Sequence, residues 1–300
     1  ESLADLVIFV GARLTQRIGY GLPPKFNKDA KFIQIDIHPE EIGRNRHVDL
    51  AINSDASYAL NAIYETLVER KCSIAVYDNW VSTSLKDKLN FIETVGNSTE
   101  VIHPYQIARN LMKVFPDNAI YIGDGADIQN WMHAYLKIGI KNTFIDHYPL
   151  GSMGIGTPLA IGAAAAEAEF SVKNKRVPRK VIHVTGDGAF GFYSSEFNGA
   201  SLANLDITTI ISNDGAWGTE KHGQRIAISK QINTEFGDVN YSLIGEAFGC
   251  LSVQISDPNM INSYLIKSIE HNVCIICVGN IASGGTGKTP HVNYIAKILS

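Results

Sequence analysis

The sequence predicts an α/β protein built on a mostly parallel, doubly wound sheet. Short apolar runs alternate with longer helical patterns along nearly the whole chain, and several of the runs are continuous and rich in Val and Ile. Alternation of strands and helices is typical of parallel β–α–β units. Strands that helices cover on both faces are apolar throughout, because neither face meets water.

Six segments are predicted to be strands, namely residues 5–10, 31–37, 119–122, 180–185, 207–212 and 273–278. Five segments between them are predicted to be helices, namely residues 56–69, 104–114, 156–169, 193–203 and 240–248. The polar region 71–100 contains Trp80 and is interpreted as a linker. We therefore expect a partial α/β domain at 1–70, a larger α/β domain at 101–280 and a short segment at 281–300.

The bulk composition places limits on function. The chain has 300 residues, of which 45% are hydrophobic and 19% charged, as in soluble globular proteins. A net charge of -4 gives no basic field for nucleic acid. No apolar run approaches the roughly 18 residues of a membrane span. Four cysteines are too few for a disulfide framework, so we expect a reducing, cytoplasmic compartment.

Two neighbouring predicted strands each end in a polar turn rich in glycine. The first turn contains Gly186, Asp187, Gly188 and Ala189, and the second contains Asn213, Asp214, Gly215, Ala216, Trp217 and Gly218. Open α/β sheets bind ligands at the carboxyl ends of their strands. The glycines allow close approach of a bulky anion, and the helix that follows offers N–H groups to phosphate. The two aspartates add the oxygen ligands that a hard divalent cation needs.

A tight turn without a ligand would explain the Gly-Asp-Gly run if it stood alone. Here two such turns follow two strands of one β–α–β unit, and each turn supplies a carboxylate. The combination resembles the signature of thiamine-diphosphate enzymes. That resemblance implies thiamine diphosphate and Mg²⁺ as cofactors, with Asp187, Asp214 and the carbonyl of Ala216 as metal ligands. It also implies cofactor contacts from the other residues of the two turns, Gly186, Gly188, Ala189, Trp217 and Gly218. Position 214 holds Asp where the family more often has Asn.

A second match is the run Gly-Ser-Met-Gly-Ile-Gly at 151–156, followed by a helix of small residues. It resembles a segment of acetolactate synthases and their relatives. The resemblance implies that Met153 wedges between the two cofactor rings and that the Gly151 carbonyl accepts a hydrogen bond from the aminopyrimidine. Both are therefore candidate catalytic positions. The alternative is an ordinary glycine loop with a Met in the core.

A third match is Gly-Asp-Gly-Ala-Asp-Ile-Gln at 123–129, which opens a predicted helix. Family resemblance implies that Ala126, Asp127 and Ile128 contact the far phosphate, although a helix start capped by an aspartate would fit too. The first 70 residues resemble the second half of a Rossmann-like central domain. Some relatives bind FAD or ADP there, which makes Gly11 and Arg13 candidates, whereas an ordinary strand-end turn is the alternative.

The resemblance implies a lyase or carboligase that attacks a 2-oxo acid or acyl-CoA, with a homo-oligomer as the full-length form. Trp217 and His222 are candidates to face the substrate, or to pack in the core. In the family a pyrimidine-binding domain supplies a glutamate that starts catalysis. No such domain precedes Glu1, and we expect the isolated chain to be inactive.

The C-terminal segment has a different pattern. A glycine loop at 279–290 ends in Gly287, Lys288 and Thr289 and precedes a predicted helix, which is the context of a phosphate-binding P-loop. It resembles the loop of tetraacyldisaccharide 4′-kinase, although Ala282 stands at the first glycine position. We interpret it as a fragment joined to the thiamine half. A P-loop kinase fragment and a catalytically silent phosphate- and metal-binding module are the alternatives.

Overall fold

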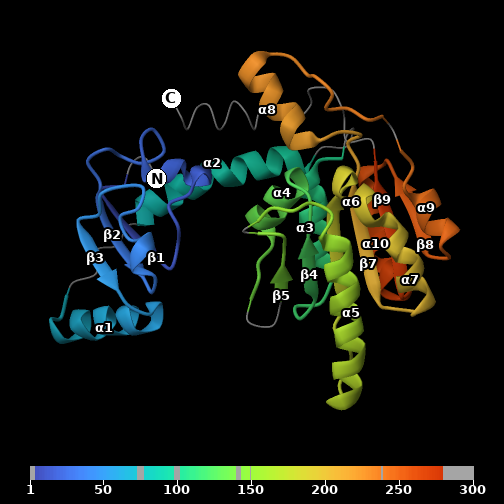
Figure 1. Ribbon diagram of the computed structural model, residues 1–300, viewed down its shortest axis with the longest axis horizontal. Helices are drawn as coiled ribbons and strands as arrows, with labels where there is room; N and C mark the ends of the chain where they lie inside the picture. The colour runs from blue at the N-terminus through green and yellow to red at the C-terminus, as the bar shows by residue number, and fades with distance from the viewer. Residues whose placement is uncertain are drawn as a thin grey trace. The chain divides into compact units, whose positions relative to one another are not determined.

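The computed structural model describes residues 4–72, 78–97, 102–139, 143–148, 150–237 and 239–279. They fall into two compact units, the first ending at Ser82 and the second beginning at Thr83 (Figure 1). The kinase-like segment 281–300, with Gly287, Lys288 and Thr289, lies outside the described residues. Within the described ranges, no helix is both long and apolar enough to cross a bilayer.

The N-terminal unit is a three-stranded parallel sheet with one long helix. Its strands β1 (Leu6–Val10), β2 (Lys31–Asp36) and β3 (Leu50–Asn53) lie in the order β1-β2-β3. The short 3₁₀ helices η1 (Gln16–Gly21) and η2 (Pro39–Glu41) follow β1 and β2, and helix α1 (Ala56–Glu69) follows β3. One face of the sheet packs on an aromatic core, in which the rings of Phe9 and Phe32 stack 5.8 Å apart.

The C-terminal unit is built on a six-stranded sheet in the order β5-β4-β6-β7-β9-β8, and every neighbouring pair is parallel. The strands are β4 (Ile120–Gly123), β5 (Thr143–Ile145), β6 (Val181–Gly186), β7 (Ile207–Ser212), β8 (Leu251–Ile255) and β9 (Val273–Val278). The parallel α/β class predicted from the sequence is confirmed. Parallel pairing brings the carboxyl ends of all six strands to one edge of the sheet.

Helices cover both faces of this sheet. Helices α3 (Pro104–Val114), α4 (Asp127–Tyr135) and α10 (Ile261–Ile269) pack on one face. Helices α5 (Gly156–Lys173), α6 (Asp187–Tyr193), α7 (Phe197–Leu202) and α9 (Ser242–Ala247) pack on the other. Successive strand residues alternate between the two cores, as Val181 and Ile182 of β6 do. The strands are therefore apolar throughout, which is the pattern visible in the sequence.

Some elements differ from the prediction. Helices α1 and α3 and strands β7 and β9 have the predicted bounds, whereas residues 193–203 form the 3₁₀ helix η3 (Ser194–Glu196) followed by α7. Ser favours caps and turns over helix interiors, and two of them stand at this break. Region 71–100, interpreted as a linker, contains helix α2 (Asp78–Gly96). Strands β3, β5 and β8, the 3₁₀ helix η4 (Pro258–Met260) and helix α8 (Gly218–Ile228) were not predicted.

A buried carboxylate on α5 ties that helix to the start of β6. The side chain of Glu167 accepts hydrogen bonds from the Arg179 backbone N–H at 3.1 Å and from Arg179 Nε at 2.9 Å. It also forms an ion pair with Arg176 at 2.8 Å. The hydrogen bond from Arg176, together with those from Arg179, lowers the pKa of Glu167 to about 2.

We predict that Glu167→Gln lowers the free energy of unfolding at pH 7 by about 2 kcal/mol, because a neutral side chain cannot pair with both arginines. The folded pKa lies below the ordinary 4.5. The stabilisation by the carboxylate is thus complete above the ordinary pKa of 4.5 and is lost as the pH falls from there toward about 2. Urea denaturation between pH 7 and pH 3.5 should show the two proteins converging in acid. Glu169→Gln, an exposed position on the same helix, is the matched control. A difference that does not depend on pH would contradict the assignment.

Candidate functional site

A pocket lies at the carboxyl edge of the six-stranded sheet, beside the ends of β4, β6 and β7. Strand β4 has β5 on one side and β6 on the other, so the chain reverses its direction of winding between β4 and β6. Loops that leave adjacent strands in opposite directions open a crevice between them. The turn after β4 meets the turn after β6 closely, since a Cβ added to Gly125 would lie 3.0 Å from the Gly186 nitrogen.

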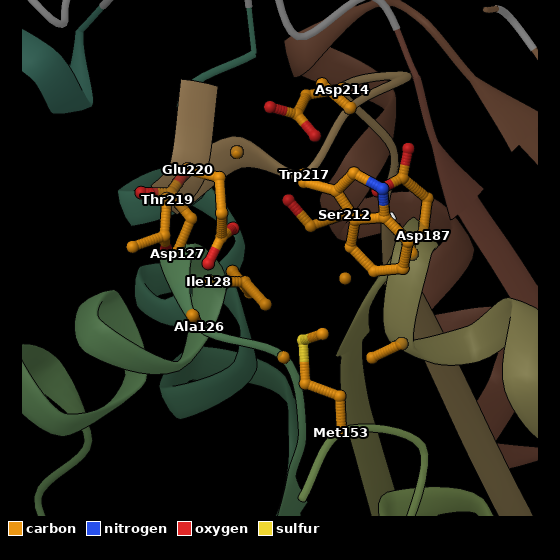
Figure 2. Close-up of a pocket in the computed structure, with 16 residues that line it drawn as sticks. Ala126, Asp127, Ile128, Met153, Asp187, Ser212, Asp214, Trp217, Thr219 and Glu220 are labelled. Carbon is orange, nitrogen blue, oxygen red and sulfur yellow. Dashed lines mark hydrogen bonds between the residues drawn. The ribbon is translucent and has the colours of Figure 1, made fainter. Parts of the chain in front are cut away.

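The pocket gathers residues from four separate segments of the sequence. Figure 2 shows Asp127 and Glu220 on one side of a shared space, Asp187 and Trp217 on the other, and Met153 extending from the loop below. The lining residues are Gly125, Ala126, Asp127, Ile128, Met153, Gly186, Asp187, Gly188, Ala189, Ser212, Asp214, Ala216, Trp217, Gly218, Thr219 and Glu220.

Asp187 joins the two glycine turns. Its Oδ1 accepts a hydrogen bond from the Gly188 N–H at 2.8 Å, and its Oδ2 accepts one from the Gly215 N–H at 2.7 Å. The residue is only 2% exposed although it is acidic. A buried carboxylate is stable only if N–H donors or cations balance its charge. The backbone of the second turn is therefore fixed by the side chain of the first.

The site is rich in negative charge. Burial and, to a smaller extent, the neighbouring Asp214 carboxylate raise the pKa of Asp187 to about 7. Backbone N–H groups of the two turns oppose that rise. Asp127 and Glu220 add two more carboxylates to the same lining. A divalent cation placed between the aspartates would balance this repulsion and favour their ionised forms.

The second turn leads into α8 through a tightly packed indole. A Cβ added to Gly188 would lie 2.6 Å from the Trp217 ring, so only glycine fits beneath it. The ring also lies 5.5 Å from Phe236 and 6.1 Å from Phe192, measured between ring centroids. Trp217 therefore lines the pocket and packs against its neighbours at the same time.

Asp124 holds the glycine loop that carries Met153. It is fully buried, and its carboxylate accepts hydrogen bonds from the N–H groups of Gly125 at 2.6 Å, Gly154 at 3.2 Å and Gly156 at 2.7 Å. His147 Nδ1 lies 3.6 Å from the same carboxylate. The loop has no room for a side chain at Gly156, because a Cβ there would lie 2.5 Å from the Asp124 Cβ. The path of the loop is thus set by one buried aspartate.

All but one of the cofactor contacts predicted from the sequence line this pocket. The exception is Gly151, which lies two residues before Met153 and donates its N–H to the His147 carbonyl at 2.9 Å. Gly11 and Arg13 line another pocket, within the N-terminal unit, together with residues such as Asp36. The lining residues Gly125, Ser212, Thr219 and Glu220 were not predicted as contacts, although each lies within two residues of a predicted contact.

The lining fits a diphosphate held through a divalent cation. Two carboxylates from adjacent strand ends provide hard oxygen ligands, and the glycine turns leave space for a bulky anion beside them. The N-terminus of α4 also faces the pocket through Ala126, Asp127 and Ile128, and the positive end of a helix dipole favours a phosphate. Without the cation, the acidic side chains would repel the diphosphate.

Comparison with known families agrees with this fit. Residues 124–278 match the family described as "Thiamine pyrophosphate enzyme, C-terminal TPP binding domain". The chain belongs to the thiamine pyrophosphate enzymes. Residues 2–63 match the central domain of the same enzymes. The kinase-like segment at 281–300 falls outside both matches.

Curated relatives that the chain matches include acetolactate synthases and 2-hydroxyacyl-CoA lyases. The "Probable acetolactate synthase large subunit" of Methanococcus aeolicus is 30% identical over 283 residues, which cover 90% of this chain and 46% of that protein. The 2-hydroxyacyl-CoA lyase 1 of Mus musculus is 25% identical, covering 89% of this chain and 47% of that protein. The acetolactate synthase large subunit of Corynebacterium glutamicum is also 25% identical, with 90% and 42% covered. The chain thus spans about half the length of the curated relatives it matches.

We predict that Asp124→Asn loosens the glycine loop that carries Met153, because the amide nitrogen of Asn cannot accept a hydrogen bond from a backbone N–H as a carboxylate oxygen does. The loss of one or more such buried bonds should cost about 1 to 3 kcal/mol of unfolding free energy. Hydrogen exchange should be faster at the Gly154 and Gly156 amides than in the wild type. Asp117→Asn, in an exposed turn, is the control. Unchanged exchange at both glycines would show that Asp124 does not hold the loop.

Proposed function

We propose that this chain provides the diphosphate- and cation-binding part of the active site in a thiamine-diphosphate- and Mg²⁺-dependent enzyme. The observation that carries the proposal is the pair of acidic residues, Asp187 and Asp214, which reach one pocket from the ends of the adjacent strands β6 and β7. When bound, thiamine diphosphate supplies the nucleophilic carbon and the electron sink for making or breaking a carbon–carbon bond beside a carbonyl.

The residues of the second turn and Asp187 would hold the cation. The side chains of Asp187 and Asp214 would supply two oxygen ligands, and the backbone carbonyl of Ala216 a third. Asp187 is prepared for this role, because its two oxygens already accept backbone N–H bonds that fix its orientation. The cation would then link the acidic lining to the diphosphate, which otherwise would be repelled by it.

Two other parts of the pocket would orient the rest of the cofactor. The N-terminus of α4 would donate N–H groups of Ala126, Asp127 and Ile128 toward the far phosphate. Met153 would support the rings from the loop that Asp124 fixes, and the Gly151 carbonyl would accept a hydrogen bond from the aminopyrimidine. We propose that a pyrimidine-binding domain completes the pocket, and that the full enzyme is a homo-oligomer.

The proposed reaction is that of a carbon–carbon lyase or carboligase. Relatives named as acetolactate synthases and as 2-hydroxyacyl-CoA lyases support a 2-oxo acid or an acyl-CoA as the substrate class. The aromatic and apolar side chains of Trp217, Met153 and Ile128 would exclude water from the pocket. Exclusion of water strengthens the electrostatic interactions of the groups inside.

We predict that thiamine diphosphate binding to this chain requires Mg²⁺ and is weakened at least about tenfold by Asp187→Ala, because the diphosphate then loses its bridge to the protein. Isothermal titration calorimetry with Mg²⁺, and again with EDTA, measures this. Asp214→Asn keeps an oxygen ligand and is the matched control, which should still bind the cofactor when Mg²⁺ is present. Equal affinity of wild type and Asp187→Ala in both conditions would reject the cation bridge.

Met153→Ala should separate the two ends of the cofactor. We expect weaker binding of thiamine diphosphate but unchanged binding of inorganic pyrophosphate with Mg²⁺, since the Met153 side chain supports the rings and not the phosphates. Removing the half-buried Met153 side chain from such a contact should cost about 1 to 3 kcal/mol. Calorimetric titration with both ligands gives the ratio. An equal loss for both would assign Met153 to the general packing of the pocket.

A further inference from the structure

A short antiparallel ladder holds the turn that carries Ala216. The Trp217 N–H donates to the Thr234 carbonyl at 2.9 Å, and the Phe236 N–H donates to the Gly215 carbonyl at 3.0 Å. Between these bonds Ala216 and Glu235 form an antiparallel bridge. Helix α8 and the loop after it thus form an excursion whose two ends are joined at the proposed cation site.

The two ends are joined a second time by side chains. Lys221 on α8 forms an ion pair with Glu235, whose backbone is the bridge partner of Ala216. The Lys221 backbone N–H donates to the Trp217 carbonyl at 2.8 Å. Lys221 therefore contacts the turn through its main chain and the opposite segment through its amine. Farther along the excursion, Gln224 exchanges two hydrogen bonds with Ile232, at 2.7 and 3.3 Å.

The burial of Lys221 is unusual for its residue type. Its side chain is 1% exposed, whereas that of Glu235 is 55% exposed. An ammonium group away from water is stable only beside an opposite charge, so the position of Glu235 is constrained by the amine. Neither Lys221 nor Glu235 lines the pocket. The ion pair therefore restrains the backbone of the short ladder in which Ala216 and Glu235 are paired.

We propose that Lys221 and Glu235 are positioning residues that set the orientation of the Ala216 carbonyl toward the bound cation. The inference rests on the proposed function. The turn 215–217 lies between two restraints, because the Gly215 N–H donates to Asp187 Oδ2 at 2.7 Å while the ladder holds its other edge. Loss of the ion pair would release that second edge and leave Asp187 in place. The cation would then keep its carboxylate ligands and lose the geometry of its carbonyl ligand.

The test uses the whole chain with thiamine diphosphate and Mn²⁺, a probe whose electron paramagnetic resonance reports both binding and ligand geometry. Lys221→Met should raise the Kd for Mn²⁺ about 10-fold or more, as loss of groups that orient metal ligands typically does. It should also change the spectrum of the bound ion. Lys221→Arg keeps the charge and should restore both. Lys230→Met, an exposed lysine in the same excursion, is the control for loss of positive charge.

Glu235→Gln and the double variant Lys221→Met/Glu235→Gln complete the test. The single change leaves an ammonium buried without a countercharge, so it should lower the melting temperature most. The double change removes both charges and should recover stability while Mn²⁺ binding stays weak. Wild-type affinity and spectrum in folded Lys221→Met would overturn the inference and leave the pair a purely structural one. Absence of Mn²⁺-dependent cofactor binding in the wild type would instead reject the proposed function itself.

Discussion

The hydrogen bonds of the Asp187 carboxylate are the interaction on which the pocket depends. Asp187 follows β6, and its second oxygen accepts the N–H of Gly215, which follows β7. One buried side chain therefore fixes the relative position of two turns that are separated by 28 residues in the sequence. The parallel sheet makes this possible, because both strands end at the same edge. The Asp214 carboxylate lies near enough to influence Asp187, and Ala216 lines the same pocket.

The same arrangement places two acidic side chains, Asp187 and Asp214, at one pocket. Burial of the Asp187 carboxylate raises its pKa, and repulsion from the nearby Asp214 carboxylate adds to that rise. A fold selected only for stability would avoid two carboxylates here, since apolar residues of similar size would pack without the desolvation cost. The lining is consistent with a site that is complete when a cation and a phosphate group occupy it together. This is the physical basis of the proposed thiamine diphosphate site.

Stability and ligand binding are assigned to different parts of the C-terminal unit. The network around Glu167 joins α5 to the beginning of β6, at the opposite edge of the sheet from the pocket. Near the pocket, the buried charges of Asp124 and Lys221 hold loops instead of the sheet. Each contacts backbone that carries a proposed cofactor contact, Met153 in one case and Ala216 in the other. Changes to these loops should therefore affect ligand binding more than they affect the stability of the fold.

The sequence by itself determined the parallel α/β class and the positions of the central strands. A strand buried on both faces is a continuous apolar run, which can be recognised from its own residues without knowledge of the neighbouring strands. It also placed Asp187 and Asp214 at neighbouring strand ends, since local motifs carry those residues. Only the tertiary structure decided contacts between distant segments. Asp124 accepts a hydrogen bond from Gly156, which is 32 residues away in the sequence. Lys221 forms an ion pair with Glu235 beside an isolated bridge that no periodic pattern in the sequence indicates. Short or partly exposed strands such as β5 were missed for the same reason. Their stability comes from pairing with a neighbour, and local sequence does not encode that pairing.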